Sequence, residues 1–153
     1  MSELAHIIDE LREIHAGNAW HGPALRESLT GVSAKDATVR VVPNAHCIWE
    51  IVCHITGWEN VFRRRLQGET AAEPESGDFP QPTEIDDRIW NDDLANLDSE
   101  HEKLLQLLEK FTDSSLDQNV PQRDYTVRFL LHGIIRHHVY HAGQIGLLRK
   151  AFT

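Results

Sequence analysis

The clearest structural pattern in the chain lies in residues 86–111, which read DDRIWNDDLANLDSEHEKLLQLLEKF. Apolar residues recur there three and four positions apart, and this spacing places them on one side of an α-helix. They are Ile89, Trp90, Leu94, Leu97, Leu104, Leu105, Leu108 and Phe111, with His101 on the same side. Thr83 and Asp86, just before this run, resemble a helix-capping arrangement. We therefore expect a long helix whose apolar side must be covered by other helices.

Three further segments have the same helical spacing of apolar residues: residues 2–29, 44–67 and 126–150. In the first of them, a Gly-Pro pair predicts a kink or a short break near residues 20–23, because proline lacks a backbone N–H. The last begins with Thr126, a residue type that caps helix N-termini. The chain therefore contains four candidate helices.

The segments between these helices are polar and contain most of the prolines. They cover residues 32–44, 68–82 and 112–124, and each is long enough to run along a helix of about 30 Å. Only residues 38–42 resemble a strand, and only weakly. We therefore predict an all-α protein, a four-helix bundle with long crossover connections, which forms one domain over residues 1–153.

The composition excludes several functional classes. Twenty-four acidic residues against 15 Lys and Arg give a net charge of −9, and such a surface repels nucleic acid. No apolar run approaches the ~20 residues of a membrane span, and the polar start is unlike a secretion signal. The two cysteines, Cys47 and Cys53, cannot form a disulfide framework. We expect a cytoplasmic protein without nucleic-acid or membrane partners.

Histidine is unusually frequent, with ten in 153 residues, and three of the ten lie close together in RHHVYHAGQI, residues 136–145. Residues three or four apart share one side of a helix, so His137 and His141, or His138 and His141, could bind one metal ion. By helical phase, His138 lies near the middle of the apolar side and His137 at its edge. A metal ligand that must also meet substrate belongs at the edge, which favours His137 and His141.

A catalytic zinc-type site usually has three protein ligands and an open position, so this pair needs a third ligand. His54 lies at the border of the apolar side of the helix expected over residues 44–67, one turn before Trp58. Glu50, one turn before His54, could serve as an outer acceptor or as an acid/base group. Ligands from two helices of one bundle are an established way to build such a site.

The other histidines and the tryptophans have simpler interpretations. Packing or surface roles are expected for His6, His15 and His101, whereas His21, His46, His132 and His138 are left undecided. The four tryptophans suit packing positions, although Trp20 and Trp58 could also wall a pocket. The metalloprotease motif H-E-x-x-H is absent, as are phosphate-binding and dinucleotide-binding motifs. A Cys53–His54 nucleophile pair is disfavoured because adjacent helical residues point in different directions.

Several short motifs together resemble the DinB-like superfamily of metal-dependent enzymes. They are WEIVCHITGW (residues 49–58), HHVYHAGQI (residues 137–145), LR (148–149), WHGP (20–23), YT (125–126) and LHG (131–133). The resemblance implies a four-helix bundle, often dimeric, with a three-histidine site for a divalent metal ion between helices. Carried over to this sequence, the ligands are His54, His137 and His141, the same three that helical phase selects.

The resemblance also suggests a function, since relatives include thiol-cofactor-dependent transferases and isomerases. We expect a metal-dependent enzyme with Zn²⁺ or Ni²⁺ at the three histidines, a small-molecule substrate, and hydrolysis or thiol transfer as the reaction. A homodimer is also expected. The alternative is a metal-binding or dimerising helical bundle without catalysis, and a third hypothesis is a bundle whose histidines only pack.

Overall fold

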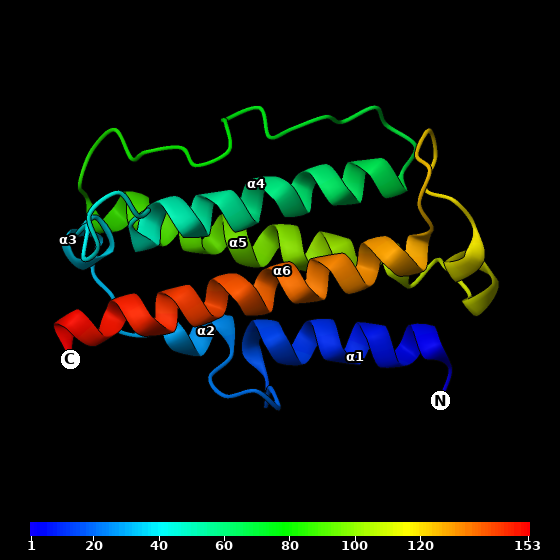
Figure 1. Cartoon of the computed structure of the whole chain (residues 1–153), viewed down its shortest axis with the longest axis horizontal. Helices are drawn as coiled ribbons and strands as arrows, with labels where there is room; N and C mark the ends of the chain where they lie inside the picture. The colour runs from blue at the N-terminus through cyan, green and yellow to red at the C-terminus, as the bar shows by residue number, and fades with distance from the viewer.

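The computed structural model describes all 153 residues and contains helices but no strands. Its four long helices are α1 (Glu3–Ala16), α4 (Ile48–Leu66), α5 (Asp87–Leu108) and α6 (Val127–Leu148). Figure 1 shows these four helices side by side. The shorter elements are α2 (Leu25–Ser28), α3 (Ala34–Ala37) and the 3₁₀ turns η1 (Asp113–Asp117) and η2 (Arg149–Phe152). The all-α prediction is confirmed.

The connection between α4 and α5 determines how these two helices are oriented. Both run in the same direction in Figure 1, so residues 67–86 return along the whole length of α4. Gly57 of α4 lies under this connection: a Cβ atom there would stand only 2.9 Å from the Cβ of Pro74. A larger residue at this position would therefore push the connection away from α4.

Helix capping explains where the long helices begin. Thr126 caps α6 as predicted, since its hydroxyl accepts the Phe129 N–H at 3.2 Å. At α5 the cap is Asp86, which accepts N–H groups of the first turn, so Thr83 has no capping role. Helix α4 starts at Ile48 and not at residue 44, because the Glu50 carboxylate accepts the Cys47 N–H at 2.8 Å and fixes the first turn there.

The N-terminal third of the chain differs most from the sequence prediction. The first helix ends at Ala16, and the expected kink is a full break before α2. The segment expected to be a plain connection contains α3, which Ser33 caps by accepting the Asp36 N–H at 3.1 Å. Residues 38–42 form no strand.

The apolar core consists of two clusters, one toward each end of the long helices. The first contains Trp49 and Trp90, whose rings lie 5.1 Å apart, and the second lies where α1, α5 and α6 meet η1. Trp20 is 100% exposed, so the prediction that all four tryptophans pack is wrong for this residue. It lies between α1 and α2, in the break that releases its side chain to solvent.

Between the two apolar clusters, the long helices bury polar side chains. This polar belt comprises His54, Glu59, Glu100, His101, His138 and His141, and His15 of α1 is buried as well. Because buried polar groups are costly without partners, the contacts of the belt are the natural place to look for function. None of the helices is both long enough and apolar enough to span a lipid bilayer.

Candidate metal centre

Three histidines, two of them from the polar belt, meet between α4 and α6. His54 comes from α4, and His137 and His141 come from consecutive turns of α6. The Nε2 atom of His137 lies 2.9 Å from Nε2 of His54 and 3.1 Å from Nε2 of His141. These are the three residues selected from the sequence, and their ligand atoms are close enough together to hold one metal ion.

The other ring nitrogens determine what the three Nε2 atoms can do. His54 Nδ1 lies 2.8 Å from the backbone oxygen of Asp78 and 3.0 Å from its carboxylate, and His141 Nδ1 lies 2.6 Å from the side-chain oxygen of Gln144. These oxygens only accept, so each Nδ1 must carry the proton. In the neutral rings, Nε2 of His54 and of His141 is therefore a lone pair directed at His137.

His137 cannot satisfy both neighbours. A neutral His137 with its proton on Nε2 can donate that proton to only one of the two neighbours. Its Nε2 then faces the lone pair of the other neighbour without a hydrogen bond. Its Nδ1 is buried and has no partner, so nothing in the protein fixes the proton there. Lone pairs converge from three rings, two of which are oriented from behind by oxygen acceptors, and such a group could hold a divalent transition-metal ion.

The connection between α4 and α5 completes the centre. The ring of Phe79 stacks on His54 at 3.9 Å and on His46 at 3.6 Å, and the Trp58 Nε1–H donates to Asp78 at 2.6 Å. Asp78 and Phe79 were not identified from the sequence. They lie in an irregular segment whose position depends on packing against α4, so no spacing rule applies to them.

Glu50, the candidate acid/base residue, lies at the start of α4, and its hydrogen bonds lead away from the three histidines. Its carboxylate accepts the Cys47 N–H and pairs with Arg40 at 2.6 Å. Burial alone would raise the pKa of Glu50, but these two donors outweigh it and hold the pKa below its ordinary value. Glu50 is therefore an ionised helix-capping residue, and its part in proton handling stays a prediction.

Burial keeps two imidazoles of the centre neutral, those of His137 and His141. Burial, with a smaller contribution from His141 and His54, lowers the pKa of His137 to about 3, and burial also lowers the pKa of His141. The Trp58 N–H lowers the pKa of Asp78, which is therefore ionised beside His54. Neutral imidazole is the form that binds metal, so His137 and His141 are in the ligand form at neutral pH.

A groove lies beside the centre, on the α5 side of α4. It encloses about 740 Å³ between α4, α5 and the 74–83 segment, and it is lined by Cys53, Asn60 and Asp93 among others, but by none of the three histidines. Burial raises the pKa of Cys53 to about 12, so this thiol stays protonated at neutral pH. The groove therefore offers volume but no thiolate. Trp20, proposed as a pocket wall, is exposed and lines neither the groove nor the metal centre. Trp58 is linked to the centre by its hydrogen bond to Asp78.

The metal-free protein is expected to lose stability on acidification already at pH values well above those at which carboxylates titrate. Burial, together with the neighbouring His101, lowers the pKa of His15 to about 4, against about 6.5 in the unfolded chain. Between these two values the unfolded state binds more protons, so stability is complete above pH 6.5 and falls as the pH drops toward 4. Proton binding to His15 in the unfolded chain should by itself lower the free energy of unfolding by roughly 2 to 3 kcal/mol at pH 4.5.

Urea unfolding in EDTA at pH 7 and at pH 4.5 measures this loss directly. The His15→Gln variant is the control, because glutamine does not titrate and should reduce the difference between the two pH values. Equal stability of the wild-type protein at both pH values would contradict the prediction.

An all-helical chain with three convergent histidines between two of its long helices is typical of helical metal-binding proteins. Comparison with protein families gives a more specific result: the sequence model of the DinB superfamily matches residues 18–145. The match covers most of the chain, and the protein therefore belongs to the DinB superfamily. Comparisons with curated proteins and with solved structures gave no match.

Proposed function

We propose that the protein is a metal-dependent enzyme that holds one divalent ion, Zn²⁺ or Ni²⁺, on His54, His137 and His141. The observation that carries this proposal is the convergence of the three Nε2 atoms, with Nδ1 of His54 and of His141 already engaged by oxygen acceptors. Lone pairs that face one another repel unless a proton or a cation lies between them, so histidines that only pack would not be expected to adopt this arrangement. Membership of the DinB superfamily supports the same conclusion.

Each neighbouring residue has a defined task in this proposal. Asp78 and Gln144 orient the rings of His54 and His141 and increase their basicity as ligands. Phe79 and Phe62 are apolar neighbours of the ligand rings, with Phe62 edge-on to His137, and limit the access of water. A divalent ion held by three imidazoles supplies a Lewis acid that lowers the pKa of a water or of a substrate thiol.

The reaction class follows from that chemistry. Three protein ligands leave a position for a further ligand on the ion, and in this proposal a small-molecule substrate takes that position. We propose hydrolysis or thiol transfer as the reaction, with Glu50 as the residue that the sequence suggested for proton handling. The alternative function, metal binding without catalysis, requires that no small molecule reach the ion.

Cobalt substitution separates these two functions. Untagged protein is freed of metal, loaded with one Co²⁺ per chain, and titrated with a small thiol while the visible spectrum is recorded. For the enzyme we expect stoichiometric binding and a spectral change that saturates with thiol. Binding without a response to thiol would favour the non-catalytic function, and the absence of Co²⁺ binding would overturn the metal centre itself.

Two further features belong to the proposal. The four long helices would form the four-helix bundle of the family, with residues 67–86 as its crossover. Homodimerisation stays a prediction: α6 exposes Phe129, Tyr140 and Leu147, and their spacing of 11 and 7 residues places them on one side of the helix. A row of exposed apolar side chains is the kind of surface that a second copy would cover.

A further inference from the structure

A second group of buried side chains in the polar belt has no role in the three-histidine centre. Glu59 of α4, His101 of α5 and His138 of α6 meet between three helices, and they are 1%, 3% and 1% exposed. Glu59 continues the apolar side of α4, one turn after Ile55, so a carboxylate is directed into the core. Such a residue needs a positive partner or a proton.

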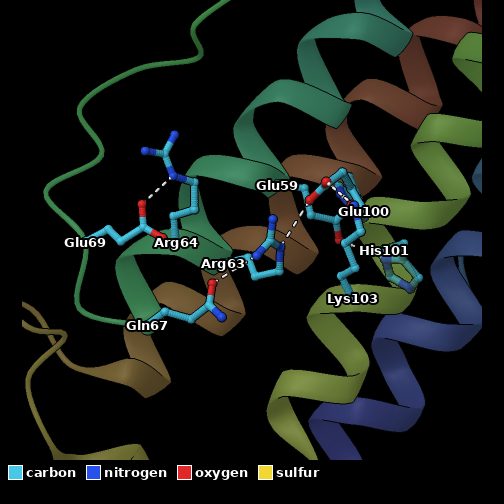
Figure 2. Close-up of polar contacts among 9 residues, drawn as sticks. Glu59, Arg63, Arg64, Gln67, Glu69, Glu100, His101 and Lys103 are labelled. Atoms are coloured by element: carbon cyan, nitrogen blue, oxygen red, sulfur yellow. Dashed lines mark hydrogen bonds and ion pairs between the residues drawn. The ribbon is translucent and has the colours of Figure 1, made fainter.

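No lysine or arginine provides that partner. Arg63, one turn after Glu59, pairs with Glu100 at 3.1 Å, and Lys103 pairs with the same carboxylate at 3.0 Å (Figure 2). Glu59 has only histidines as ionic partners. Burial raises the pKa of Glu59 and lowers the pKa of His138 well below its ordinary value. Each group on its own therefore favours its neutral form.

The distances between these groups suit a shared ion. His101 Nδ1 lies 2.8 Å from one Glu59 oxygen, and His138 Nε2 lies 3.7 Å from the other. The second distance is too long for a hydrogen bond. Two ligands about 2.1 Å from one ion can be up to about 4.2 Å apart, so 3.7 Å lies within the range of a metal-bound pair. The three ligand atoms are within 4.8 Å of one another.

The same group contains polar atoms without partners. Glu59 Oε2, His101 Nε2 and His138 Nδ1 are all buried and make no hydrogen bond. An unsatisfied buried polar atom costs about 1 to 3 kcal/mol, and an ion bound by His101 Nδ1 and His138 Nε2 would give Glu59 Oε2 the partner that it lacks. His15 stacks flat on His101 at 4.1 Å and is held by Asp98 at 2.7 Å, which fixes the His101 ring. The side chains are therefore oriented although their hydrogen bonding is incomplete.

We propose that Glu59, His101 and His138 form a second metal site, which takes a divalent transition-metal ion of the Zn²⁺ class and joins α4, α5 and α6 at the centre of the polar belt. The mixed carboxylate and imidazole donors suit such an ion. Its positive charge would compensate the Glu59 carboxylate, which no basic side chain does. Because the ligands are almost completely buried, the ion enters as the chain folds and has a structural role.

Counting bound ions tests this site separately from the three-histidine centre. The full chain is unfolded in chelator, refolded with excess Zn²⁺, freed of unbound ions by desalting, and analysed for zinc by mass spectrometry. We expect two ions in the wild-type protein, one in Glu59→Gln and one in His141→Ala. Glu100→Gln is the matched control: it removes a neighbouring carboxylate of the same belt and should keep both ions.

The possible outcomes distinguish the two sites. One ion in both the wild-type protein and Glu59→Gln, and none in His141→Ala, would overturn the second site and leave the first intact. One ion in the wild-type protein, none in Glu59→Gln and one in His141→Ala would support the second site and overturn the first. Should Glu59→Gln fail to fold, anomalous scattering at the zinc edge from crystals of the refolded wild-type protein decides: a peak between Glu59 and His138 is expected, and its absence overturns the proposal.

Discussion

The His141→Ala variant is expected to bind exchangeable Zn²⁺ at least about a hundredfold more weakly than the wild-type protein. His141 Nε2 lies 3.1 Å from His137 Nε2, so the variant removes one of three convergent donors. Loss of an outer partner of a metal ligand alone costs about 10- to 100-fold in affinity, and loss of the ligand itself should cost more. Competition with a chromophoric chelator measures the affinity at the native pH.

His132→Ala is the matched control for this measurement. His132 also lies on α6, is half-buried, and belongs to neither histidine group. Its replacement removes an imidazole from the same helix and should leave the Zn²⁺ affinity unchanged. Equal affinities of His141→Ala and the wild-type protein would show that the three histidines do not hold the exchangeable ion.

The second large effect concerns stability: Trp49→Ala is expected to lower the free energy of unfolding by about 3 to 5 kcal/mol. Trp49 is completely buried, packs against Trp90, and donates its Nε1–H to Asp93 at 2.7 Å. Its removal leaves a large cavity in the first apolar cluster and takes the indole donor from the Asp93 carboxylate. Urea unfolding at constant metal content measures the loss.

Trp20→Ala tests the same substitution at an exposed position. The Trp20 side chain is 100% exposed, so its replacement should change the free energy of unfolding by no more than about 0.5 kcal/mol. Similar losses in the two variants would contradict the burial difference between these tryptophans.

The fold was largely predictable because amphipathic helices show their period directly in the sequence. The spacing of apolar residues identified all four long helices, and Thr126 caps α6 as expected. The ends of the other helices were less predictable, since they depend on contacts that spacing does not reveal. The start of α4 is an example: it is fixed by the Glu50 side chain, for which the sequence suggested the role of an outer acceptor or of an acid/base group.

The three-histidine centre was predictable to different degrees. His137 and His141 follow from one turn of helix, a local geometry that holds wherever α6 lies. Gln144, one turn further, follows from the same rule and is part of the DinB-like motif. Asp78 and Phe79 had no comparable signal, because they belong to a loop whose path along α4 depends on Pro74 packing over Gly57.

The sequence by itself determined the four helical segments, the all-α class and the pairing of His137 with His141, because each depends on the fixed geometry of a single helix. Only the tertiary structure decided that His54 meets this pair, that Trp20 is exposed, and that Glu59, His101 and His138 converge. The residues of this second group come from three helices far apart in the chain. Their meeting depends on which helices are neighbours and how these are rotated, and that is set by the packing of the whole core.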